Sequence, residues 1–94
     1  MVIMQHNVVS SAATQVVASA TTAQNVCIKN CGPDYKVMLL TASNQNISQG
    51  FPLCKHEALT IQLAASNAVF ARLPAQAGGN SGNVVSQVAV FVTP

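Results

Sequence analysis

The sequence predicts an all-β protein, a small antiparallel β-sandwich or barrel of jelly-roll-like type. Three observations support this fold class. Several runs alternate apolar and polar residues with a period of two, which is typical of strands with one buried face. Turn-forming residues recur at regular intervals between these runs. Val and Thr are frequent, and we expect no helix of ordinary length.

Residues 50–73 contain the clearest pattern, and we expect the rest of the chain to cover them. In residues 59–63 the apolar residues fall on odd positions with polar residues between them. Residues 64–67 are a small, polar connection, and residues 68–73 form a second run. The residues of this second run that share one face are Val69, Ala71 and Leu73. Two strands this close in sequence predict a β-hairpin.

Three further strands are expected, two before this stretch and one after it. In residues 24–30, Val26 and Ile28 share one face. In residues 35–40 both faces become apolar toward Leu40, so that end is expected to be covered on two sides. Residues 84–93 alternate well and form the last strand; residues 30–34, 41–49 and 74–83 are expected to be turns or loops.

The first 23 residues are the least regular part of the chain. They are rich in Ser, Thr, Ala and Val without clean alternation, and the Thr and Ser residues disfavour a helix. We expect an extended N-terminal arm over residues 1–23, with one or two short strands, followed by a β-sandwich domain over residues 24–94. The alternative is that this segment supplies a strand to the domain's own sheet.

The composition limits the classes of function. Half of the residues are apolar, only 6% are charged and the formal net charge is +2. Four scattered cations and four aromatic residues provide neither a phosphate-binding stripe nor a stacking platform, so we expect no nucleic-acid partner. No apolar run approaches the roughly 20 residues of a membrane span, so we expect no membrane association. A monomer with so few charges would be poorly soluble, so we expect much of the surface to be covered by other subunits.

The weak candidates for a metal site are Cys27, Cys31, Cys54 and His56. Residues four apart in an extended strand lie about 13 Å apart, whereas zinc ligands lie about 2.3 Å or less from one ion. Cys27 and Cys31 therefore do not converge unless the turn begins before Cys31. We expect no bound metal, no cofactor and three free thiols; a Cys31–Cys54 disulfide stays geometrically open.

The acidic residues are Asp34 and Glu57, both next to turns. We expect the Glu57 carboxylate to accept backbone N–H bonds in the turn over residues 54–57. The sequence lacks a nucleophile-elbow motif and a candidate Ser–His–acid triad, so we expect a protein that is not an enzyme.

Four short segments resemble a known group of proteins. They are residues 26–33 (VCIKNCGP), 50–53 (GFPL), 57–61 (EALTI) and 68–71 (AVFA). Together they are similar to the small all-β structural proteins of tailed-bacteriophage virions, which include capsid decoration (cement) proteins and minor tail or fibre proteins. The resemblance covers roughly residues 26–92.

The resemblance implies a non-enzymatic decoration protein that assembles in the host cytoplasm and is located on the capsid surface. It would bind the lattice of the major capsid protein as a homotrimer and stabilise the shell, while the N-terminal arm clasps neighbouring capsid proteins. The alternative is a tail- or fibre-associated β-sandwich that binds a carbohydrate or protein receptor. The residues expected at subunit or capsid interfaces are Met38, Leu40, Phe70, Phe91, Val8, Val9, Val16 and Val17.

Overall fold

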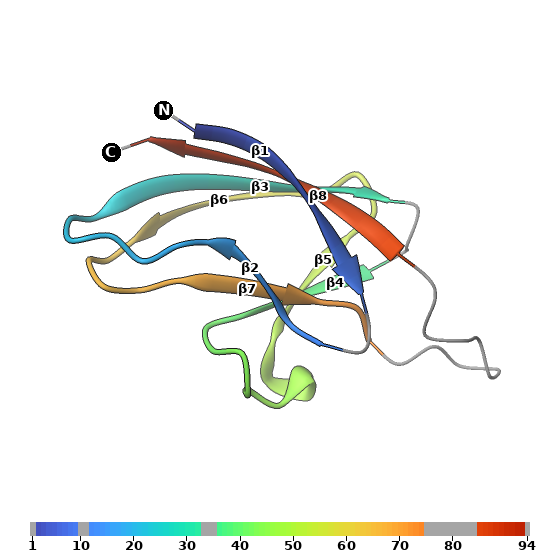
Figure 1. Ribbon diagram of the computed structural model, residues 1–94. Coiled ribbons are helices and arrows are strands. Elements are labelled where there is room, and N and C mark those ends of the chain that lie inside the picture. Colours follow the sequence, from blue (N-terminus) through green and yellow to red (C-terminus); the bar gives the residue numbers. More distant parts are fainter. Residues whose placement is uncertain (1, 10–11, 33–35, 75–84, 94) are drawn as a thin grey trace, which may run out of the picture.

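The computed structural model describes residues 2–9, 12–32, 36–74 and 85–93. Within these ranges the chain forms eight β-strands, one turn of 3₁₀ helix and no α-helix. The strands make two antiparallel sheets of four strands each, which lie one above the other in Figure 1. The predicted all-β class is therefore confirmed.

The first sheet contains the longest strands, in the spatial order β1-β8-β3-β6. Its members are β1 (Val2–Val9), β8 (Val85–Thr93), β3 (Gln24–Gly32) and β6 (Ala58–Leu63). The second sheet has the order β2-β7-β4-β5. Its members are β2 (Thr14–Val17), β7 (Val69–Arg72), β4 (Lys36–Leu40) and β5 (Phe51–Cys54). The 3₁₀ turn, η1, spans Ile47–Gln49 between β4 and β5.

The strands pair in a nested way. β1 pairs with β8, β2 with β7, β3 with β6 and β4 with β5, so the first half of the chain pairs with the second half in reverse order. Two further ladders, β3–β8 and β4–β7, join these pairs into the two sheets. Among the eight described strands, β4 and β5 are the only consecutive pair in the same sheet; every other consecutive pair lies in opposite layers. The core is consequently built from both halves of the chain.

The predicted hairpin over residues 59–73 is wrong in its pairing. Both strands exist, but β6 pairs with β3 in the first sheet and β7 pairs with β4 and β2 in the second. Alternation indicates which face of a strand is buried. Two strands in opposite layers bury one face each just as well as two paired strands of a hairpin do. The five residues 64–68 can span up to about 17 Å when extended, which exceeds the ~10 Å between packed sheets. The backbone N–H of Ser66 donates to the carbonyl of Ala20 at 2.7 Å, which ties this crossing to the β2–β3 connection.

The core lies between the two sheets and follows the predicted alternation. On most strands predicted from the sequence, the positions assigned to one face are buried, whereas Leu59, Ile61 and Leu63 of β6 are only half-buried. The buried residues are Val26, Ile28, Val37, Leu39, Val69, Ala71, Leu73, Val88 and Val90. Each large aliphatic side chain buried in this way contributes roughly 1.5–3 kcal/mol.

An N-terminal arm separate from the domain is not confirmed. Residues 2–9 form one edge strand of the first sheet and residues 14–17 form one edge strand of the second, as the alternative prediction had it. Val8, Val16 and Val17 are buried in the core. The prediction that these three valines lie at an interface with other chains is therefore corrected: they already contact the chain's own two sheets.

Leu40 is covered on two sides, as predicted. Its side chain is 2% exposed, and it lies at the end of β4 beneath the loop over residues 41–50. Gly50 packs directly on it: a Cβ atom added to Gly50 would lie 2.7 Å from Leu40 Cδ2 and 3.0 Å from the Leu39 carbonyl oxygen. The loop is held by Gln45, whose Oε1 accepts the backbone N–H of Thr41 at 2.7 Å. Leu40 is thus buried beneath the loop on the outer face of the second sheet, which leaves little of its side chain exposed for a subunit contact.

We predict that Gly50→Ala destabilises the protein, because the added methyl group enters the space of Leu40 Cδ2. Overpacking of this kind costs about 1–3 kcal/mol. Thermal or urea unfolding measures the loss. Ser43→Ala, an exposed change in the same loop, serves as the control and is expected to shift the free energy of unfolding by less than about 0.5 kcal/mol. Equal stability of Gly50→Ala and the wild type would contradict the close packing of this loop on β4.

Candidate functional site

A buried asparagine joins the end of β3 to the turn between β5 and β6. Asn30 is fully buried, and its side chain donates to the Leu53 carbonyl at 3.0 Å and accepts the Gly32 N–H at 2.9 Å. Its backbone N–H donates to the Glu57 carbonyl at 3.0 Å, and its own carbonyl accepts the His56 N–H at 2.8 Å. Four hydrogen bonds therefore fix this corner, and all polar groups of the buried residue are paired.

The turn over residues 54–57 has the predicted carboxylate contact. Glu57 Oε1 accepts the backbone N–H of Cys54 at 3.2 Å, and the Glu57 N–H donates to the Cys54 carbonyl at 2.9 Å. His56 occupies the turn with φ 66°, and Gly32 beneath it has φ 76°, a value that favours glycine. The Lys55 side chain lies over Gly32. The arrangement serves the backbone geometry of a tight corner.

The structure does not gather the weak metal candidates into one site. Cys27 and Cys31 lie in the same strand, β3, as the distance argument assumed, while Cys54 ends β5 and His56 is exposed in the following turn. All three cysteines are free. Within the ranges that the structure describes, His, Cys, Asp and Glu side chains form no group of three or more that could hold a metal ion.

One group of the predicted interface residues centres on Phe91, on the outer face of the first sheet. Phe91 is 40% exposed, and the ladder places it between Ile3 of β1 and Cys27 of β3. Ile3 is the most exposed large apolar side chain among the described residues, at 68%. We call Ile3, Phe91 and Cys27 the outer patch. Sequence analysis identified Phe91 but not Ile3, because the neighbour of Phe91 in space is set by strand pairing.

A second group lies on the opposite side of the molecule. Phe70 of β7 and Met38 of β4 are half-buried on the outer face of the second sheet. Val9 does not belong to this group: it ends β1 in the first sheet, where it is half-buried and its carbonyl accepts the Leu73 N–H at 3.1 Å. Phe91 and Phe70 therefore face away from each other, and a single flat interface does not contain both.

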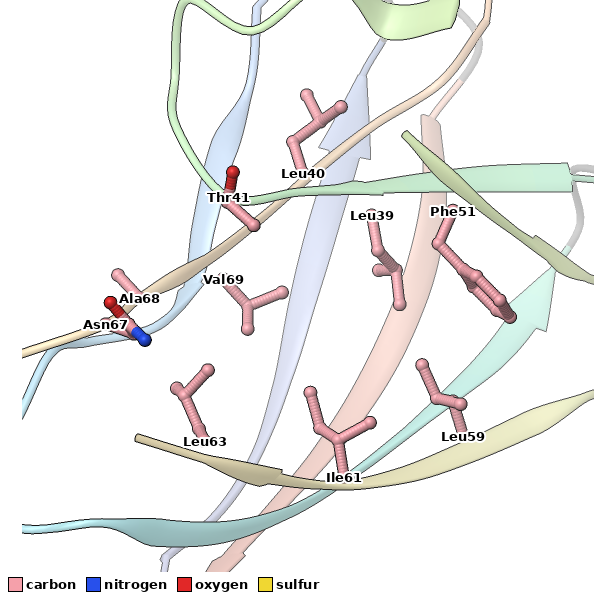
Figure 2. A pocket seen from close by; sticks show the side chains of 10 residues that line it. All are labelled: Leu39, Leu40, Thr41, Phe51, Leu59, Ile61, Leu63, Asn67, Ala68 and Val69. Atoms are coloured by element: carbon pink, nitrogen blue, oxygen red, sulfur yellow. The ribbon is translucent and has the colours of Figure 1, made fainter. Parts of the chain in front are cut away.

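A cavity of about 410 Å³ lies between the sheets at the edge formed by β6. Figure 2 shows Leu59, Ile61 and Leu63 of β6 along one wall, with Leu39, Phe51 and Val69 on the other. The polar residues of the lining are Thr41 and Asn67, which lie at the end near Leu63, together with Ala68. This cavity was not predicted from the sequence, because alternation alone predicts that the apolar side chains of β6 are fully covered.

A comparison of the chain with protein-family models, curated proteins and solved structures found no match. The described residues contain no helix with the length and apolar character needed to cross a membrane. The outer patch and the cavity are therefore interpreted from their own geometry and chemistry.

We predict that Asn30→Ala is strongly destabilising, because it leaves the Leu53 carbonyl and the Gly32 N–H unpaired in the interior. Burial of an unpaired group of this kind costs about 1–3 kcal/mol. Asn25→Ala, an exposed change in the same strand, is the matched control and is expected to be nearly neutral. Urea unfolding compares the two variants, and equal effects would show that the corner at Asn30 does not stabilise the fold.

Proposed function

We propose that this chain is a non-enzymatic structural protein of a virion, namely a capsid decoration protein with a jelly-roll architecture. The strand pairing supports the jelly-roll part of the proposal. A jelly roll has eight strands in two sheets and arises when a long hairpin is rolled up, so that paired strands alternate between the layers. The nested pairs of β1 with β8 through β4 with β5 follow this order. Viral capsid domains are among the proteins that use this architecture.

The outer patch is the observation that carries the proposal. Ile3 and Phe91 lie side by side on the face of an antiparallel sheet and are 68% and 40% exposed. The adjacent rows on this face contain small or uncharged side chains, apart from Lys29. Exposed, adjacent apolar side chains on a soluble protein are typical of a surface that binds another protein.

We infer that the outer patch contributes to a homotrimer and to its attachment to the lattice of the major capsid protein. Such attachment needs buried area and shape complementarity and does not need catalysis. Three linked copies multiply a weak individual contact through their high effective concentration. The low charge of the chain is consistent with a surface that is covered in the assembled particle.

The alternative, a fibre-associated module that binds a carbohydrate, has less support. Lectins also use jelly rolls. However, carbohydrate sites use aromatic platforms flanked by acidic or amide groups, whereas the cavity contains one aromatic residue, Phe51, and no charged residue. We therefore retain the decoration protein as the proposed function.

We predict that the wild-type chain is a trimer at micromolar concentration. Size-exclusion chromatography with light scattering should give about 29 kDa, three times the 9.7 kDa of one chain. Phe91→Ser should reduce this mass to that of a monomer, since it removes apolar area from the outer patch. Phe51→Ser, an equal change at a 52% exposed position of the other sheet, should leave the trimer intact. A wild-type monomer would overturn the proposal.

Attachment to the shell is measured separately, by co-sedimentation with shells assembled from the major capsid protein of the same genome. The expected result is saturable binding by the wild type and its loss in Phe91→Ser. A stable trimer that does not co-sediment would overturn the decoration role while leaving the trimer established.

A further inference from the structure

The two sheets separate along β6, which is an edge strand of the first sheet. Leu59, Ile61 and Leu63 point into the space between the sheets, yet each is only half-buried. Val26 and Ile28 of the neighbouring strand β3 face the same way and are 1% and 0% exposed. The row of apolar side chains on β6 therefore borders a cavity that the chain's described residues do not fill.

We propose that this cavity binds a single-chain amphiphile with a small uncharged head, such as a fatty alcohol. The site would hold the hydrocarbon chain along β6 and place the head beside Asn67. This inference is independent of the proposed role on the capsid.

The size of the cavity fits a ligand of this class. Its volume of about 410 Å³ lies within the range of roughly 300–1,000 Å³ that is typical of small-molecule sites. Its length follows β6 from Leu59 to Leu63, which is about 13 Å at the rise of an extended strand. A narrow, linear molecule matches this shape better than a compact ring system does.

The distribution of polar groups sets the orientation of the ligand. Phe51 and Leu59 close one end of the cavity with apolar surface, whereas Thr41 and Asn67 lie at the other end (Figure 2). The Thr41 hydroxyl donates to Gln45 Oε1 at 3.1 Å, so the exposed amide of Asn67 is the better partner for the head.

The absence of charge in the lining sets the class of head group. The ten lining residues include no acidic or basic side chain. A carboxylate or an ammonium group placed there would lose hydration without gaining a counter-charge, whereas a hydroxyl needs only a hydrogen bond. We therefore expect neutral amphiphiles to bind more tightly than charged ones of equal length.

An extended strand from another chain is the competing occupant, because no strand among the described residues pairs with the outer edge of β6. A strand would satisfy the backbone groups of β6, but it does not account for the polar end of the cavity. The oligomeric state of the variants below distinguishes a strand of a second copy from an amphiphile.

The test is a titration of the full chain with hexanol, octanol, decanol and dodecanol. The NMR chemical shifts of the backbone amides report the binding. Each added methylene should raise the affinity about fourfold. The increase should stop once the alcohol exceeds the length of the cavity. The backbone amides of β6 and β7 should shift at the lowest alcohol concentrations. Two charged ligands of the same chain length, decanoate at pH 8 and decyltrimethylammonium, should bind at least about tenfold more weakly than decanol.

Two variants on one strand give the matched control. Ile61→Trp fills the cavity and should reduce decanol binding at least about tenfold, whereas Thr60→Trp places the same side chain on the exposed outer face and should bind as the wild type does. Thermal unfolding checks that both are folded. If Ile61→Trp does not fold, Ala68→Met narrows the cavity at its polar end and should give the same loss.

Three results would overturn the proposal. The first is the absence of saturable binding by any alcohol. The second is an affinity for alcohols that rises with chain length without a plateau, or a decanol affinity that is equal in the two Trp variants. Either result would indicate adsorption to the surface of the protein. The third is a change of oligomeric state in Ile61→Trp but not in Thr60→Trp, which would assign the cavity to a strand of a second copy.

Discussion

The fold depends on the mutual coverage of two apolar sheet faces. Each sheet of four strands has one face of Val, Leu, Ile and Ala side chains, and neither face is stable in water without the other. Because most connections cross between the layers, consecutive strands contribute to opposite sides of one core. The nested pairing makes the coverage cooperative: removal of an inner strand such as β3 or β4 would expose both layers at once. The hydrogen bonds of Asn30 fix one corner of this arrangement.

The same constraint explains where apolar surface is left uncovered. Strands in the middle of each sheet are covered from the opposite layer, whereas β6 lies at an edge and borders the cavity. The outer patch has a different origin, because Ile3 and Phe91 belong to a sheet face that none of the described strands covers. A chain with 6% charged residues has few charged side chains to keep a protein with such exposed apolar surfaces soluble. Burial of these surfaces by other molecules is the physical link that we propose between this composition and a role in assembly.

The sequence was sufficient for local properties of the strands and insufficient for their partners. The period of two identified the core residues Val26 and Ile28, and the two apolar faces near Leu40 predicted its double coverage. Turn chemistry predicted the contact of the Glu57 carboxylate. The pairing of β6 with β3 was missed, because alternation does not distinguish a neighbour in the same sheet from a strand in the opposite one. Val16 was assigned to an arm for a related reason: a four-residue strand is too short to show a period.

The measurement that tests the nested pairing most directly is a set of cross-strand backbone NOEs from NMR of the full chain. The structure predicts NOEs between β3 and β6, for example around Cys27 and Thr60, and between β4 and β7, around Leu39 and Ala71. It also predicts that β6 and β7 show no such ladder. A regular series of NOEs between β6 and β7, as in a hairpin, would contradict the account.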